Sequence, residues 1–131
     1  WSPDLSRRAL RDDAPEYVSG DMISPFKAVV GGGYKTVEAR LESAIHIRFG
    51  LPARTPAGDK TLIKRADQIA AYFEATELAG FTDAEARSFF GAPRGITVES
   101  HSIEPLPATD AERSFLARFA AIEATRTANG S

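Results

Sequence analysis

The chain has 131 residues, of which 43% are hydrophobic and 26% charged, and its formal net charge of -2 accompanies an isoelectric point near 5.7. This composition excludes a disordered tail, and the lack of a basic surplus argues against a nucleic-acid polymer as partner. The chain contains no cysteine, which excludes disulfides and thiolate zinc sites, and it has no apolar run of membrane-spanning length. We therefore expect one cytoplasmic domain over residues 1–131.

Two short helices are expected at the start of the chain. The first covers residues 2–12, with a serine and a proline at its beginning, and it ends before Pro15, which disfavours helical geometry in the preceding residue. The second covers residues 13–20, because the spacing of Asp13 and Glu16 is typical of a capping box. Proline and glycine separate these elements from the rest of the chain.

Residues 21–33 contain too many helix breakers for a long element, and Gly31–Gly33 are expected to form a flexible hinge. A long amphipathic helix is then expected from Tyr34 to Gly50, followed by a loop over residues 52–59. The side chains expected on its buried side are Val37, Leu41, Ala44, Ile45 and Phe49.

Residues 60–80 show the strongest helical periodicity in the chain. The side chains expected on the buried side of this helix are Leu62, Ala66, Ile69, Ala70, Phe73 and Leu78. A short helix over residues 83–90 should follow, with Thr82 as its N-terminal cap.

The last part of the chain is less regular. Residues 94–107 alternate in polarity and predict either a short strand or an extended crossing. A final helix is expected to open at Thr109, with a frayed tail from Ala124. Its expected inward side chains are Phe115, Leu116, Phe119 and Ile122. With helices nearly throughout, the predicted fold class is all-α.

Carboxylates are the candidate chemical groups. Several gather in residues 11–21, RDDAPEYVSGD, and Asp67 lies inside the long apolar helix, where an aspartate is rarely buried unpaired. If Asp67 meets the pair Asp12-Asp13, a cation or an arginine must lie between them. The alternative is a salt bridge from Asp67 to Arg11 or near Arg65, with Asp13 as a simple helix cap. Both interpretations remain open at this point.

Two segments of the sequence resemble blocks of the HD-domain phosphohydrolases, closest to the bacterial 5′-deoxynucleotidase-like group. They are DDAPEYVSGDMISPFK at residues 12–27 and IKRADQIAAYFEATELAGF at residues 63–81. The resemblance implies an HD-domain-like helical bundle that hydrolyses a nucleotide phosphomonoester through metal-activated water. The first histidine ligand of that family would lie upstream of Trp1, so we expect the chain to be the central and C-terminal portion of such a domain.

The resemblance also implies roles for particular residues. The implied metal ligands are Asp12, Asp13 and Asp67, the catalytic residues are Glu16 and Asp21, and the phosphate-binding residues are Lys27 and Lys64. The implied cofactor is a divalent ion: manganese, cobalt, magnesium or iron. Asp12 stands where the family has histidine, and a set of carboxylates suits magnesium, calcium or manganese and binds them more weakly.

This substitution leaves an alternative function open. A catalytically impaired HD homologue would keep the fold and act as a nucleotide-binding or partner-binding module. The expected partner of either form is a small nucleotide or other phosphomonoester rather than a membrane. A homodimer is also expected, because a domain without its N-terminal helices exposes apolar helix faces.

Overall fold

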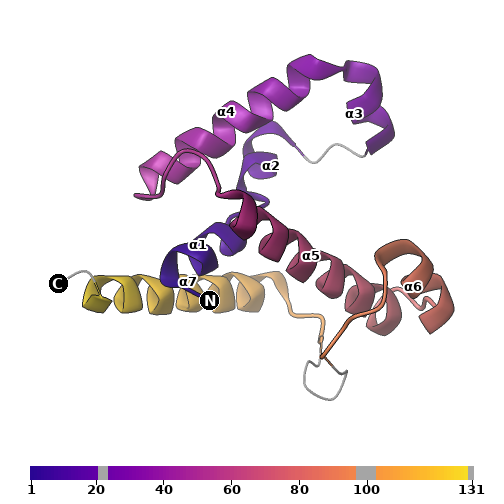
Figure 1. Ribbon diagram of the computed structural model, residues 1–131. Coiled ribbons are helices and arrows are strands. Elements are labelled where there is room, and N and C mark those ends of the chain that lie inside the picture. Colours follow the sequence, from indigo (N-terminus) through magenta and orange to yellow (C-terminus); the bar gives the residue numbers. More distant parts are fainter. Residues whose placement is uncertain (21–23, 97–102, 130–131) are drawn as a thin grey trace. The chain divides into compact units, whose positions relative to one another are not determined.

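The structure is a computed structural model that describes residues 1–20, 24–96 and 103–129. Every regular element within these ranges is a helix, so the predicted all-α class is confirmed (Figure 1). The helices are α1 (Pro3–Leu10), α2 (Ala14–Ser19), α3 (Ser24–Val30), α4 (Gly32–Arg48), α5 (Ala57–Glu77), α6 (Asp83–Phe90) and α7 (Ala108–Asn129). Across the described ranges, none combines the length and the apolar character needed to cross a membrane.

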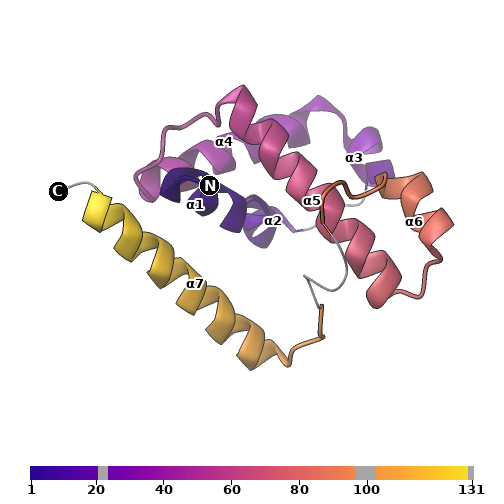
Figure 2. The same cartoon turned by 60° about the horizontal axis from the view of Figure 1, so that its bottom comes forward.

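The chain divides into two compact units. Unit 1 contains residues 1–59 and 119–131, and unit 2 contains residues 60–118. The boundaries between the units fall within α5 and α7, which Figure 2 labels. The units are described separately below.

Helix α1 starts where the sequence predicts. The side chain of Ser2 accepts a hydrogen bond from the backbone N–H of Leu5 at 3.2 Å, and Pro3 occupies the first helical position. The helix ends at Leu10, two residues before the predicted end. Its buried face contains Arg7 and Arg8 beside Leu5, which the apolar pattern of the sequence does not predict.

Arg8 ties α1 to the segment between α4 and α5. Its guanidinium donates to the Thr55 hydroxyl at 3.0 Å and to the Pro52 carbonyl at 3.4 Å. It also lies 3.7 Å from the carboxylate of Asp59 and 3.5 Å from Nδ1 of His46, which is buried. Since only 3% of Arg8 is exposed, these contacts satisfy a cation that is removed from water.

Arg7 of α1 and Arg11, which caps its C-terminus, contact the C-terminal part of α7. Nε of Arg7 lies 2.6 Å from the carboxylate of Glu123. The guanidinium of Arg11 lies 3.7 Å from the ring centre of Phe49 and 4.5 Å from that of Phe119. Desolvation, followed by the positive charge of Arg7, lowers the pKa of Arg11 from its usual value. The core of unit 1 is therefore built around stacked and paired cations.

Arg126 makes the last of these connections. It donates to the carbonyl of Gly50 at 3.0 Å and lies 3.3 Å from the carboxylate of Asp4. Gly50 has a φ of 68°, and a Cβ there would meet the Arg126 guanidinium at 3.1 Å. Glycine is thus favoured at this turn by its positive φ, and a larger residue would also have to displace the end of the Arg126 side chain.

Helices α2 and α3 both contact α4 in unit 1. Helix α4 begins at Gly32, so the predicted hinge is wrong for Gly32 and Gly33, which form its first turn. Only Gly31 departs from helical geometry, with a φ of 77° that separates α3 from α4 without a loop. The sequence therefore overestimates the length of this break.

The predicted buried side of α4 is partly wrong. Val37 and Ala44 are exposed, whereas His46 is buried. Nδ1 of the buried histidine lies 3.4 Å from the carbonyl of Ala53 and 3.5 Å from the Arg8 guanidinium, so polar groups of the protein replace water at this atom.

Unit 2 has a small apolar core where the end of α5 meets α6. The core consists of Tyr72, Phe73, Ala75 and Ala86, with Ile69, Phe90, Ile96 and Ile103 packed against it. Phe73 is buried as predicted, but Leu62 and Leu78 are exposed and Ile63 is buried instead. The buried side of α5 therefore differs from the predicted one.

Helix α6 matches the prediction from the sequence. It covers Asp83–Phe90, and Thr82 caps it. The Thr82 hydroxyl accepts from the backbone N–H of Glu85 at 3.3 Å, while the Thr82 N–H donates to the Glu85 carboxylate at 2.8 Å. This reciprocal pair is a capping box, which fixes the start of the helix.

Asp83 links α6 back to the core of unit 2. The hydroxyl of Tyr72 donates to its carboxylate, and Nε of Arg87 donates to the same group at 2.5 Å. The bond from Arg87, followed by that from Tyr72, lowers the pKa of Asp83. Hydrogen bonds from the backbone and then the side chain of Thr82 lower the pKa of Glu85 in the same way.

These lowered pKa values predict that unit 2 loses stability in acid. The unfolded carboxyl groups titrate near pH 4 and bind protons before the folded ones do. The stabilisation contributed by these two carboxylates is therefore present above about pH 4, and it is lost as the pH falls through their lower pKa values in the folded state. Thermal unfolding followed by circular dichroism from about pH 7 to about pH 3 should show this decline, and Asp83→Asn should weaken it. An identical pH profile in the variant would contradict the assignment to Asp83.

The C-terminal part of the chain differs from prediction in two ways. The alternating stretch 94–107 contains no strand in its described residues, and residues 97–102 lie outside them. Helix α7 starts at Ala108 and continues to Asn129, so the tail from Ala124 to Asn129 is helical rather than frayed. Of its predicted inward side chains, Ile122 is buried and Phe119 is half-buried, whereas Phe115 and Leu116 are exposed.

Candidate functional site

The predicted metal ligands Asp12 and Asp13 lie in the turn between α1 and α2, and both are exposed. Asp13 occupies the N-cap position of α2 but makes no capping hydrogen bond with its side chain. The predicted capping box is therefore wrong. The reason is the backbone, because Asp13 has a ψ of 1° rather than the extended conformation of a capping residue.

The carboxylate of Asp13 is also without an ion pair or hydrogen bond among the described residues. Arg11, the residue directly before the Asp12-Asp13 pair, is fixed between two aromatic rings. The turn thus presents its carboxylates to solvent from a well-anchored helix end.

The predicted catalytic residue Glu16 and the predicted phosphate-binding residue Lys27 come together in unit 1. Nζ of Lys27 lies 3.6 Å from the carboxylate of Glu16 and 3.5 Å from that of Glu38. It also lies 5.7 Å from the ring centre of Tyr34, whose hydroxyl donates to the carbonyl of Gly20 at 3.1 Å. One lysine of α3 thereby connects α2 to α4.

The charge of this lysine is stabilised by its neighbours. Partial desolvation lowers the pKa of Lys27, but the negative charges of Glu38 and Glu16, with the hydrogen bond to Glu38, raise it overall above its usual value. Lys27 therefore remains protonated at neutral pH and keeps Glu16 paired with a cation. Glu38 and Tyr34 are residues that the sequence analysis missed, since no local pattern connects them to Lys27.

The remaining predicted site residues lie in unit 2, except Asp21, which lies outside the described residues. Asp67 and Lys64 form a salt bridge of 2.7 Å on an exposed face of α5. This agrees with the alternative of a local salt bridge for Asp67 near Arg65, because the partner Lys64 is the residue directly before Arg65. An exposed pair of this type contributes less than about 1 kcal/mol.

The carboxylates of Asp12, Asp13 and Asp67 have the donor chemistry of a hard divalent ion. Asp12 and Asp13 belong to unit 1, whereas Asp67 belongs to unit 2. Within the part of either unit that the structure describes, no three histidine or acidic side chains gather closely enough to hold a metal ion. The chemistry of the donors thus fits the implied ion, and each unit alone supplies an incomplete set.

The chain is similar to an uncharacterized protein of Rhodobacter capsulatus, with 48% identity over 110 residues. The alignment covers 84% of this chain and 56% of that relative, so the chain spans about half the length of the relative. No protein-family model matches the chain.

Proposed function

We propose that this chain is part of an HD-type, metal-dependent phosphohydrolase that acts on the phosphomonoester of a nucleotide. The observation that carries the proposal is that the Asp13 carboxylate has no structural partner among the described residues. This carboxylate stands at a helix start, yet it neither caps the helix nor pairs with another described residue. A carboxylate that is exposed without a structural partner is available as a ligand.

In this proposal Asp12, Asp13 and Asp67 are the residues that would hold a divalent ion, and the ion would supply an activated water molecule. Glu16 orients the attacking water by accepting a hydrogen bond from it. Lys27 holds the Glu16 carboxylate in place through an ion pair of 3.6 Å. Asp21 would support the same water. Lys64 would contact the phosphate, which would replace Asp67 as its partner.

The proposal predicts a metal-dependent rise in thermal stability. Manganese, cobalt or magnesium should raise the Tm of the chain, since an ion that binds only the folded state stabilises it by mass action. Asp67→Asn and Asp13→Asn should each abolish the rise. Asp110→Asn is the matched control, because Asp110 also forms an exposed salt bridge with a residue three positions away, at 3.0 Å from Arg113.

The control should retain the full metal-induced shift. The proposal fails if the three metals leave the Tm of the unsubstituted chain unchanged, or if Asp110→Asn loses the shift as completely as Asp67→Asn. Release of phosphate from deoxynucleoside monophosphates in the presence of manganese would then measure the activity directly.

A second candidate is a nucleotide-binding or partner-binding module without catalysis. It is favoured by Asp12, because a carboxylate in place of the family's imidazole weakens metal binding. Lys27 pairs with Glu16 and Glu38, and Lys64 pairs with Asp67, so a phosphate bound at either lysine would replace these carboxylates. Calorimetric binding of a nucleotide without phosphate release would support this candidate, and measurable turnover would exclude it.

We also propose a homodimer for either function. The support is a group of exposed apolar side chains on α2, α3 and α4, of which Tyr17 is 94% exposed. The others are Val18, Phe26, Val29, Val30 and Val37. These side chains lie on neighbouring helices, since α2 and α3 both contact α4, and exposed apolar side chains can form a protein interface.

A further inference from the structure

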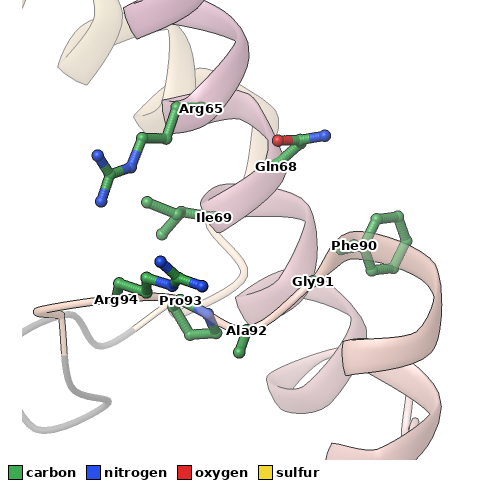
Figure 3. A pocket seen from close by; sticks show the side chains of 8 residues that line it. All are labelled: Arg65, Gln68, Ile69, Phe90, Gly91, Ala92, Pro93 and Arg94. Carbon is green, nitrogen blue, oxygen red and sulfur yellow. The ribbon is translucent and has the colours of Figure 1, made fainter.

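A pocket of about 410 Å³ lies in unit 2, beside the middle of α5 and the chain that follows α6 (Figure 3). Its walls are formed by Arg65, Gln68, Ile69, Phe90, Gly91, Ala92, Pro93 and Arg94. Figure 3 shows the Ile69 side chain between those of Arg65 and Arg94. The volume is in the range of sites for small molecules.

The charge of the pocket has one sign. Two of its lining residues, Arg65 and Arg94, are cations, and the lining contains no acidic residue. Both arginines are exposed, and neither forms a hydrogen bond or an ion pair within the described residues. By contrast, Arg87 and Arg113 of the same unit are paired with aspartates at 2.5 and 3.0 Å.

The apolar side of the pocket is supported by the core of unit 2. Ile69 and Phe90 pack against the buried cluster that contains Phe73 and Ala86. Pro93 adds a rigid ring close to Arg94 (Figure 3). The pocket therefore combines a fixed apolar wall with two guanidinium groups that have no other described partner.

We infer that this pocket binds a small organic phosphate, with its phosphate group at Arg65 and Arg94 and its carbon portion against Ile69 and Pro93. The two positive charges match the charge of about -1.5 to -2 that a phosphate monoester carries near neutral pH. Guanidinium groups also bind phosphate oxygens through paired, charge-assisted hydrogen bonds.

The site is separate from the one proposed for catalysis. Arg65 and Asp67 are two residues apart on α5, and side chains at this spacing point away from each other. Ile69 lies on the same side of the helix as Arg65 (Figure 3), whereas Lys64 lies beside Asp67. Binding at the pocket requires neither Asp67 nor a metal ion, so the two proposals succeed or fail independently.

The test is a titration of the whole chain with phenylphosphonate, which carries a phosphate-like dianion at about pH 8 and has no ester bond to hydrolyse. EDTA is present throughout, and amide signals are followed by nuclear magnetic resonance. We expect shifts at Ile69, Gly91 and Ala92. Arg65→Gln and Arg94→Gln should each weaken binding about tenfold, which corresponds to the loss of one charge-assisted contact.

Arg113→Gln is the matched control, because it removes an exposed arginine of the same unit from outside the pocket, and it should leave the affinity unchanged. Benzyl alcohol, which lacks the charge, should cause no shifts at the same concentrations. Equal affinity in the double variant Arg65→Gln/Arg94→Gln and the unsubstituted chain would overturn the inference. Shifts confined to Gly31–Gly33 and Lys35 would overturn it as well, since they would place the anion in unit 1.

Discussion

Replacing Arg8 by alanine is expected to lower the free energy of unfolding of unit 1 by about 3 kcal/mol. The side chain is 3% exposed and holds the segment from Pro52 to Asp59 through its hydrogen bonds and its ion pair. Its loss leaves the Pro52 carbonyl and the Thr55 hydroxyl without their donor, and it leaves a void beside His46. Urea unfolding followed by amide hydrogen exchange in α1 and α4 measures the change.

Arg40→Ala is the control for this experiment. Arg40 is an exposed arginine of α4, so its truncation should change the free energy of unfolding by less than about 0.5 kcal/mol. If both variants unfold at the same urea concentration, Arg8 does not anchor α1. The experiment also concerns the proposed site, because α1 carries the turn with Asp12 and Asp13.

The helices of this chain are predictable where a local signal determines them. Ser2 and Thr82 both cap the helices that the sequence assigns to them, and α6 has the predicted bounds. Such caps need only residues within one turn, so tertiary structure does not override them. The positions of the long helices follow for the same reason from their periodicity.

The buried faces are harder to predict, because they depend on which element lies opposite. Arg7, Arg8 and Arg11 are buried in unit 1, although a pattern of hydrophobic residues assigns arginine to the surface. Their partners are Glu123, Asp59 and the ring of Phe119, which are distant in sequence. No spacing rule within α1 contains this information.

In the candidate site, too, local contacts are predictable from the sequence and contacts between distant residues are not. Lys64 and Asp67 are three positions apart on one helix, and the sequence predicts a local salt bridge for Asp67 as one of two alternatives. Glu38 joins Lys27 and Glu16 only because α2 and α3 both contact α4. The capping role of Asp13 was wrong for a different reason, since residue types suggest a cap but the backbone angle decides whether the carboxylate reaches the helix.

The largest loss of stability in unit 2 is expected from Phe73→Ala, at about 3–5 kcal/mol. Phe73 is 3% exposed, and its ring packs edge-on against that of Tyr72 at 5.4 Å between centres. Its removal leaves a cavity in a core of few residues, which has little capacity to close around it. Urea unfolding with hydrogen exchange of the α5 and α6 amides gives the magnitude.

Phe89→Ala is the matched control, because Phe89 is the same residue type in the same unit but is 72% exposed. Its replacement should cost less than about 1 kcal/mol, and equal costs for the two variants would contradict the position of the core.

The Phe73 variant also connects stability to binding. Because Ile69 and Phe90 pack on the Phe73 cluster, the pocket between Arg65 and Arg94 depends on that core for its apolar wall. Phe73→Ala should therefore weaken phenylphosphonate binding while both arginines remain in place, whereas Phe89→Ala should preserve it.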